Sequence, residues 1–327
     1  MVCFGNLFSD SLKGYQLDFV FVIFGITGLW LGTELTISGA LTIAKRHQLS
    51  DFFVGLVILS FGSDLPEIAV AVDAGIKTSL GQDASGVVVG SSIGSIVGQI
   101  GFVLGLTGLI AYLTLPRRFI YQHGAVLLGA TVLLFLVAVD GTVTRTEGLI
   151  LITLYLIYVF VLMRGEKVTG GPPDALAQVG YNPWLLLIMG LGTLIASSEL
   201  TVRSVVDLAT TFEVSEAVIS VLVIGFGTSL PELSISISAI MKKKTHLSVG
   251  NIVGSNILDT LLPIGIAACI APVIFERGFL LFDLPYVFIL TLLTLIFFVR
   301  IRGLQKIEAG IILGLYFVYL SIKLHQL

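Results

Sequence analysis

Charged residues and cysteines are both scarce in this chain. Only 12% of its 327 residues are charged and 56% are hydrophobic, whereas an ordinary soluble domain carries about 25% charged residues. The two cysteines, Cys3 and Cys269, are too far apart to indicate a disulfide framework or a CxxC site. The four histidines fall near the ends of apolar runs, so we expect no buried histidine base of the kind an intramembrane enzyme needs. A large soluble domain is therefore excluded, and zinc or copper binding is disfavoured.

Most of the chain consists of long apolar runs. A membrane-spanning helix needs roughly 20 apolar residues. Ten runs meet this requirement: 17–43, 52–75, 85–112, 118–139, 147–164, 183–210, 214–240, 247–274, 280–300 and 306–325. The predicted fold class is an all-α integral membrane protein with ten transmembrane helices. The first run contains Glu34 and is followed by nine more, so we expect a retained span rather than a cleaved signal.

The basic residues near the span ends predict the orientation. The odd-numbered loops together hold 12 of the 18 lysines and arginines, namely Lys45, Arg46, Arg117, Arg118, Arg164, Lys167, Lys242, Lys243, Lys244, Arg300, Arg302 and Lys306. These loops are predicted to be cytoplasmic. A multi-pass protein of the cell (plasma) membrane with both termini outside follows.

Three motifs occur twice. Phe-Gly-Ser-Asp-Leu-Pro-Glu at 61–67 matches Phe-Gly-Thr-Ser-Leu-Pro-Glu at 226–232, and Glu-Leu-Thr at 34–36 matches 199–201, both offset by 165 residues. Gly-Ser-Ser-Ile-Gly-Ser at 90–95 matches Gly-Asn-Ile-Val-Gly-Ser at 250–255, offset by 160. The sequence thus divides into a first five-helix repeat at 1–163, a cytoplasmic linker at 164–182 and a second five-helix repeat at 183–327.

Five spans in each half have a topological consequence. Because five is odd, the second half must enter the membrane from the opposite side, which predicts an inverted-topology repeat. Exchanging the conformations of two such halves moves access to a central site from one side of the membrane to the other. A transporter requires this, whereas a channel does not.

Each copy of the first motif places acidic and hydroxyl side chains beside a proline inside an apolar run. A proline has no N–H, so Pro66 and Pro231 leave the carbonyls of Gly62 and Gly227 without their helical partners. On the neighbouring spans, polar side chains follow one another at i and i+4: Ser95 with Gln99, and Ser255 with Asp259. An oxygen-only lining of this kind suits a hard cation. The alternative is a pair of proline kinks with buried, protonated glutamates used in packing.

These motifs carry a family resemblance. Gly-Thr-Ser-Leu-Pro-Glu at 227–232 and Gly-Asn-Ile-Val-Gly-Ser-Asn-Ile-Leu-Asp at 250–259 resemble the alpha-repeats of the sodium/calcium exchanger family, in the calcium/cation antiporter superfamily. The resemblance implies ion sites formed by spans 2, 3, 7 and 8, with spans 1 and 6 sliding as gates. It implies calcium ligation by Glu67, Glu232 and Asp259. Sodium would use the hydroxyls of Ser63, Thr228, Ser95 and Ser255.

The first half departs from the family pattern within the site itself. Asp64 stands where a small hydroxyl residue such as Ser229 is usual, and Gln99 stands where asparagine or aspartate is usual. Ile96 replaces the asparagine found at Asn256. One hypothesis is that charge has moved within the site, so that Asp64 compensates for the neutral Gln99. The alternative is that Asp64 forms a separate proton or cation site.

The predicted function is a secondary antiporter that exchanges calcium for sodium by alternating access. A calcium/proton antiporter is the alternative, favoured by the extra acid at Asp64. A passive cation channel and an intramembrane enzyme are the other classes, and an enzyme is not expected. Calcium, sodium, possible proton coupling and the lipid bilayer are the expected partners. Nothing in the chain predicts a resident cofactor, a nucleic-acid partner or a particular oligomeric state. Glu34 and Glu199 either line the ion pathways or hold neighbouring spans together.

Overall fold

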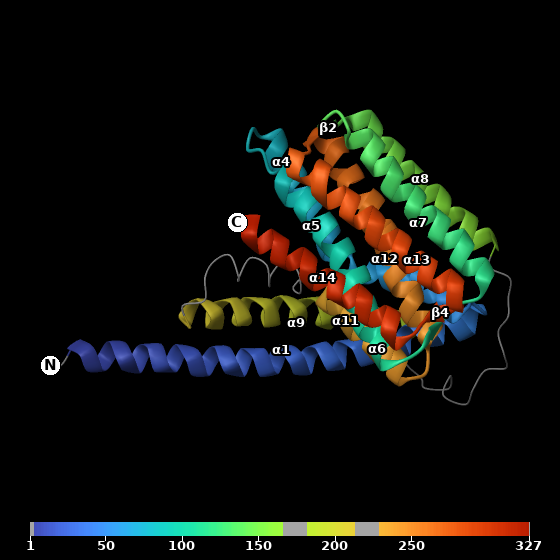
Figure 1. The fold of residues 1–327 in the computed structure, drawn as a ribbon. Helices are drawn as coiled ribbons and strands as arrows, with labels where there is room; N and C mark the ends of the chain where they lie inside the picture. Colours follow the sequence, from blue (N-terminus) through green and yellow to red (C-terminus); the bar gives the residue numbers. More distant parts are fainter. Residues whose placement is uncertain (1–2, 166–181, 213–228, 327) are drawn as a thin grey trace.

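The computed structural model describes residues 3–165, 182–212 and 229–326, which are mostly helical (Figure 1). The elements follow one another as α1 Cys3–His47, α2 Asp51–Phe53, η1 Val54–Leu59, α3 Ser60–Ser63, α4 Leu65–Ser79, α5 Ser85–Val97, η2 Gly98–Val103, α6 Leu104–Ile110, β1 Leu113–Thr114, α7 Arg117–Ala138, β2 Thr142–Val143, α8 Arg145–Gly165, α9 Pro183–Thr211, α11 Leu230–Met241, α12 Thr245–Ile270, β3 Val273–Ile274, η5 Phe279–Asp283, α13 Leu284–Ile301, β4 Gly303–Leu304 and α14 Lys306–Gln326.

The predicted all-α membrane architecture is confirmed. Among the described residues, eight helices are long and apolar enough to cross a membrane, or nine if the bent second span is counted as one. They coincide with nine of the ten predicted runs. The seventh run, 214–240, begins outside the described residues and ends in the shorter apolar helix α11. The count of ten therefore stays a prediction.

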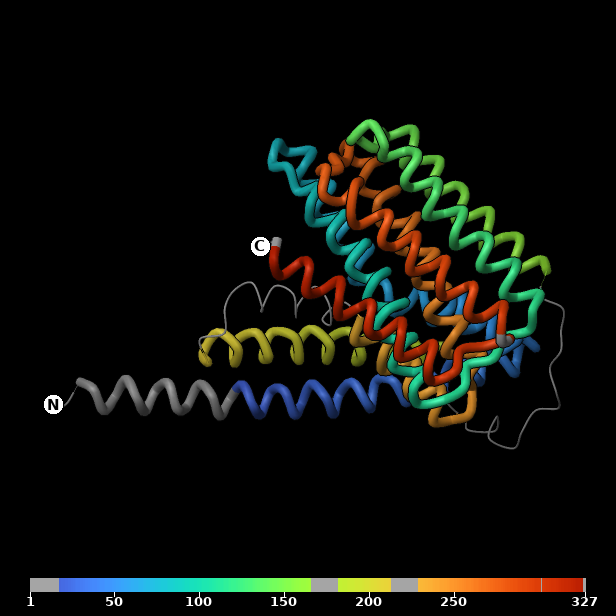
Figure 2. Tube along the Cα trace, in the orientation of Figure 1, coloured from blue at the N-terminus to red at the C-terminus, as the bar shows by residue number. Residues whose placement is uncertain are grey.

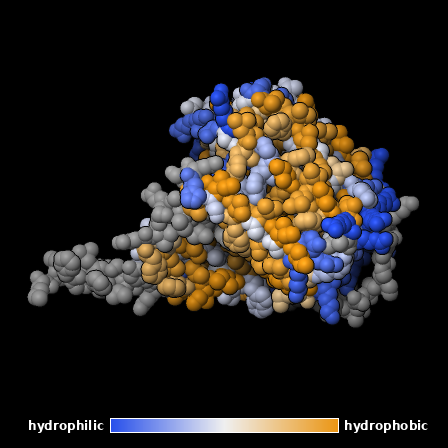
Figure 3. Space-filling view, in the orientation of Figure 1, coloured by the Kyte–Doolittle hydropathy of each residue, from blue (hydrophilic) through white to orange (hydrophobic). Residues whose placement is uncertain are grey.

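The surface agrees with a membrane environment. The face drawn in Figure 3 is largely hydrophobic, and hydrophilic residues gather toward the ends of the helices. Large apolar side chains such as Ile23, Phe160 and Ile188 are more than half exposed. Exposure of such side chains is favourable in contact with lipid tails and unfavourable in contact with water.

The second span is broken at Asp64. Its two parts, α2–α3 and α4, meet at 44°. Pro66 is in the first turn of α4, where proline is tolerated, and it cannot donate a hydrogen bond to the carbonyl of Gly62. The backbone of Asp64 (φ −88°, ψ 8°) closely matches that of Ser229 (φ −99°, ψ 5°), which precedes Pro231 in the same way. Each proline motif therefore starts a new helix with its glutamate in the first turn.

The third and eighth spans form the centre of the bundle. Of their most apolar stretches, 78% of residues are buried for α5–η2–α6 and 83% for α12. Glycines bring α12 against the second span. A Cβ added at Gly250 would lie 2.4 Å from the carbonyl oxygen of Phe52, and a Cβ added at Gly254 would lie 2.2 Å from the carbonyl oxygen of Leu56. These two glycines thus permit close packing of the helices.

The first and sixth spans pack together along their length. In Figures 1 and 2, α1 and α9 lie side by side at one edge of the bundle. Small residues line their contact, with Gly25 against Thr201 at one end and Gly39 against Leu187 at the other, so the helices are antiparallel. Close backbone approach of this kind, without bulky interdigitation, is compatible with sliding of one helix along the other.

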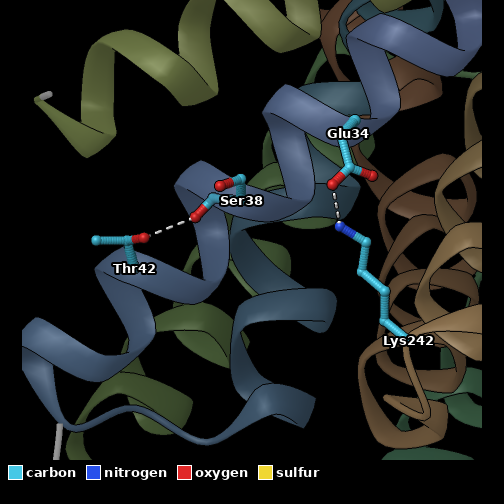
Figure 4. Close-up of polar contacts among 4 residues, drawn as sticks. All are labelled: Glu34, Ser38, Thr42 and Lys242. Carbon is cyan, nitrogen blue, oxygen red and sulfur yellow. Dashed lines mark hydrogen bonds and ion pairs between the residues drawn. The ribbon is translucent and has the colours of Figure 1, made fainter. Parts of the chain in front are cut away.

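Two lysines after α11 connect separate helices. Lys242 Nζ lies 2.6 Å from Glu34 Oε1 on α1, and Lys244 Nζ lies 2.9 Å from Asp51 Oδ2 at the start of the second span. Figure 4 shows Lys242 reaching toward Glu34, while Thr42 Oγ1 donates to the Ser38 carbonyl within α1. Of the two interpretations of Glu34, the structure favours the one in which it holds helices together.

Glu199 has a more local partner. It pairs with Arg203 one turn later on α9, and both side chains are more than half exposed. Exposed pairs of this type contribute little to stability. Among the described residues, Glu199 therefore pairs within its own helix and lies outside the buried core.

One expectation about histidine is wrong. His123 lies near the start of α7, yet it is buried, and its Nδ1 is 2.8 Å from the hydroxyl of Tyr158 on α8. Its ring packs against Phe52 and Phe119. Position near a span end did not predict exposure here, because the second span crosses close to that end and covers the ring.

Two short strand pairs tie the ends of the bundle. β1 pairs with β4, and β2 pairs with β3, both antiparallel. Figure 1 places β2 and β4 at opposite ends of the molecule. Each pair joins a connection in the first half to one in the second half.

The close contact at Gly254 gives a stability prediction. Gly254→Ala should destabilise the fold by about 1–3 kcal/mol, because the new methyl group would overlap the Leu56 carbonyl. Thermal unfolding in detergent should show a Tm lower by several degrees. Gly314→Ala, where nothing lies within 4 Å, is the matched control and should leave the Tm unchanged or slightly raised. Equal changes in the two variants would contradict the packing argument.

Candidate functional site

Four carboxyl groups and one amide gather where the broken second span meets α11, α12 and the third span. Asp64 and Glu67 come from the break and the first turn of α4, and Glu232 comes from the first turn of α11. Asp259 lies within α12, and Gln99 within η2. All five side chains are at most 3% exposed. The four acids are close enough to interact electrostatically, so they form one buried group, here called the carboxylate cluster.

The first part of the cluster contains Asp64 and Glu232. The Ser63 hydroxyl lies 3.3 Å from Asp64 Oδ1 and also donates to the Ser60 carbonyl at 3.2 Å. The carboxyl groups of Asp64 and Glu232 are close enough to interact with each other electrostatically. Two carboxylates so placed cannot both stay charged and unaccompanied, so a cation or a proton must lie between or beside them.

The second part joins the second and third spans. The Ser95 hydroxyl donates to Glu67 Oε1 at 3.3 Å. Four residues later, Gln99 Nε2 donates to Asp259 Oδ2 at 3.0 Å across the interface with α12. Gln99 therefore links the third span to α12.

Several buried oxygens of this group have no hydrogen-bond partner among the described residues. They are Asp64 Oδ2, Glu67 Oε2, both carboxylate oxygens of Glu232, Asp259 Oδ1 and Gln99 Oε1. None of the four acids takes part in an ion pair in the part of the chain that the structure describes. Orphaned buried oxygens at this density indicate that cations or protons complete the group.

The cluster is not a preformed metal site of the usual kind. Within the described ranges, no three His, Cys, Asp or Glu side chains are arranged to hold a metal ion. A cation bound here would take hydroxyl, amide or backbone oxygens among its ligands, or would draw the carboxylates closer together. Calcium tolerates such mixed oxygen shells of 6–8 ligands in flexible geometry.

The remaining predicted residues have different outcomes. Ser229 and Ser255 are buried, and their hydroxyls have no hydrogen-bond partner among the described residues. Thr228 lies outside the described residues. Asn256, absent from the predicted set, is buried on α12 one turn before Asp259; its amide donates to the Ile252 carbonyl and its Oδ1 has no partner. Its i, i+3 spacing from Asp259 was the signal that could have added it.

Comparisons with known proteins find relatives over most of the chain. A family model described as "Sodium/calcium exchanger protein" matches residues 17–164 and 182–325. A putative antiporter, CaxA, of Alkalimonas amylolytica is 30% identical over 88% of this chain and 92% of its own length. The sodium/calcium exchanger MaX1 of Methanosarcina acetivorans is 23% identical over 94% of this chain and 98% of its own length.

The fold has a solved counterpart. The sodium-calcium exchanger NCX_Mj, soaked with sodium and calcium, superposes with a TM-score of 0.79 at 24% identity. The alignment covers 93% of this chain and 98% of that one. The family model covers most of the chain and both halves, so this protein belongs to the sodium/calcium exchanger family of cation antiporters.

Proposed function

We propose that this protein exchanges calcium for sodium across the cell membrane by alternating access. The observation that carries the proposal is the carboxylate cluster, with its orphaned oxygens and no cationic side chain paired to it among the described residues. An acidic group buried at membrane depth without a basic partner is costly. A transported cation removes that cost while it is bound. The buried acids therefore favour a role in cation transport.

The proposed roles follow the chemistry of each group. Glu67, Glu232 and Asp259 supply the negative charge that a divalent ion requires, and Asp64 adds a fourth acid beside Glu232. Ser63, Ser95, Ser229, Ser255 and Thr228 are the proposed hydroxyl ligands for sodium. These ions are transported substrates rather than resident cofactors. The carboxylate cluster must therefore bind a new ion after each release in the transport cycle.

An inverted repeat is proposed as the basis of alternating access. The offset of 160 that relates the Gly90 and Gly250 motifs also relates Leu113 of β1 to Val273 of β3. Their strand partners, Leu304 in β4 and Val143 in β2, are related by a similar offset of 161. Equivalent strand pairs at opposite ends of the bundle are expected when a two-fold axis lies in the membrane plane.

A calcium/proton antiporter is the second candidate. Asp64 favours it, because a carboxyl group in place of a hydroxyl beside Glu232 gives the cluster one more group able to carry a proton. Purified protein in liposomes separates the two. Calcium-45 uptake driven by an outward sodium gradient at equal pH supports the proposal; uptake driven only by a pH gradient supports the alternative. Uptake that needs neither gradient would indicate a passive channel.

The acids at the centre of the cluster give a second prediction. Glu67→Gln and Glu232→Gln should each reduce calcium uptake by about 100-fold, since removing one charged partner of a buried ion at its binding site costs roughly 2–5 kcal/mol of binding free energy. Their melting temperatures should stay near that of the parent protein, because the amide keeps the shape and removes an unpaired charge. Glu276→Gln, on an exposed connection, is the control. Parent-like uptake in either cluster variant would reject these ligands.

Orientation gives a third prediction. In a background lacking Cys3 and Cys269, a cysteine at Lys243 should resist a membrane-impermeant maleimide in intact cells and react after permeabilisation. A cysteine added at the C-terminus should react in both conditions. The basic residues of the odd-numbered loops are the physical reason. The opposite labelling pattern would reverse the proposed orientation.

A further inference from the structure

One ion pair joins the two halves of the chain at the edge of the bundle. Glu34 lies on α1 in the first half, and Lys242 directly follows the last residue of α11 in the second half. Their charged atoms are 2.6 Å apart, and Figure 4 shows the lysine reaching across to the acid. A movement of α1 along its own axis would carry Glu34 away from α11 and break this contact, here called the first ion pair.

The repeat predicts a second ion pair of the same kind. The offset of 165 residues that relates the Glu-Leu-Thr motifs and the proline motifs also relates Glu34 to Glu199 and Lys77 to Lys242. Glu199 lies on α9, and Lys77 lies in the last turn of α4. When the two halves exchange roles, the contact equivalent to the first ion pair is therefore one between Glu199 and Lys77, here called the second ion pair.

The members of the second ion pair have other partners in the structure. Lys77 Nζ lies 2.7 Å from Asp73 Oδ2 one turn earlier on α4, and Glu199 pairs with Arg203 one turn later on α9. The packing differs in the same way. α1 packs against α11, whereas α9 and α4, which are both described in full, make no comparable contact. Equivalent positions of the two halves thus have different contacts, as an inverted repeat caught in one of two conformations should.

The charged neighbours of the two ion pairs also differ. Arg203, one turn after Glu199, corresponds in the first half to Ser38, which Figure 4 shows on α1. Asp73 corresponds in the second half to another serine, Ser238. Forming the second ion pair would therefore break two ion pairs of i, i+4 spacing, whereas forming the first breaks none at the equivalent positions.

The two ion pairs lie toward opposite ends of the bundle. Near the end of α4, Gly75 contacts Ile270, which directly precedes the connection containing β3. In Figure 1, α4 lies beside β2 at that end, and α11 lies toward β4. Because α1 and α9 pack closely along their length, we expect them to move together. A movement that brings Glu199 toward Lys77 then separates the members of the first ion pair.

We propose that the two ion pairs form in alternation, so that each stabilises one of the two conformations between which the transport cycle moves. The first ion pair is formed in the structure, and Asp73 and Arg203 favour this conformation because they compete for the members of the second. This proposal rests on the proposed alternating access. It assigns a role in conformational control to charged residues outside the carboxylate cluster.

Cysteine pairs test whether the second ion pair forms. In a cysteine-free background, a short bifunctional methanethiosulfonate should join the cysteines of Glu199→Cys/Lys77→Cys and stop sodium-driven calcium-45 uptake, and a reductant should restore the uptake. Glu34→Cys/Lys242→Cys should behave in the same way, because each crosslink holds one conformation. The matched control is Glu34→Cys/Lys77→Cys, whose cysteines lie toward opposite ends of the bundle and should not be joined.

Spin labels measure the balance between the conformations without removing the charges of the ion pairs. Labels on Arg46→Cys, at the exposed end of α1, and Leu156→Cys, on the exposed face of α8, should give two distances. Lys242→Met removes the first ion pair and should raise the population of the second conformation relative to the first by about two- to fivefold, the usual effect of a partly exposed ion pair. Glu276→Gln, on an exposed connection, is the control and should leave the populations unchanged.

The competing acid has its own test. Asp73→Ser copies the serine of the other half, so it should also raise the population of the second conformation. In a Lys77→Met background the same substitution should have no effect, because the lysine for which Asp73 competes is gone. An effect of Asp73→Ser that persists in that background would assign it to local helix stability and contradict its role as a competitor.

Three results overturn the proposal. They are a working exchanger in which Glu199→Cys/Lys77→Cys cannot be joined, a crosslink there that leaves uptake intact, and unchanged distance populations in both Lys242→Met and Asp73→Ser. If a cysteine pair fails to fold, the spin-label populations decide alone. Failure of the proposed function looks different, because the parent protein would then exchange no calcium for sodium, whichever cysteines can be joined.

Discussion

Uncompensated negative charge in the middle of a membrane protein is the constraint on which this structure depends. Asp64, Glu67, Glu232 and Asp259 are removed from both water and lipid, and no lysine or arginine among the described residues pairs with them. Isolated buried carboxylates would be neutralised or would destabilise the fold. A bundle that keeps them is stable only together with cations or protons, which makes ion occupancy part of the fold rather than an addition to it.

The helix breaks and the glycines both serve this cluster. Pro66 and Pro231 start new helices so that Glu67 and Glu232 fall in first turns, near the positive ends of the helix dipoles. The glycines of α12 bring its backbone against the second span, which carries Asp259 to the same depth. By contrast, the ion pairs of the Lys242–Lys244 segment lie at the periphery and link α1 and the second span to the end of α11. Ion pairs thus link helices at the edge of the bundle, whereas the acids at its centre have no basic partner among the described residues.

The sequence predicted nine of the spans seen among the described residues and the acids that the structure buries together, because each depends on local composition or on a repeated motif. It could not predict which groups touch. The partner of Gln99 depends on the π-helical turn at Gly98–Val103, and the partner of Glu34 depends on how α11 ends beside α1. His123 was misjudged for the same reason: its burial is set by the second span, which comes from a distant part of the sequence. Contacts between spans belong to the tertiary structure, and the residue pattern along one span does not predict them.

The central question is whether a divalent cation binds within the carboxylate cluster. Anomalous diffraction from crystals of the sodium-free protein soaked with calcium or strontium measures this directly. We expect a strong peak within roughly 2.3–2.6 Å of carboxylate oxygens of both Glu67 and Glu232, which is calcium's usual coordination distance. A divalent ion found only at the surface, with the buried acids bonded to one another or to protein donors, would contradict it.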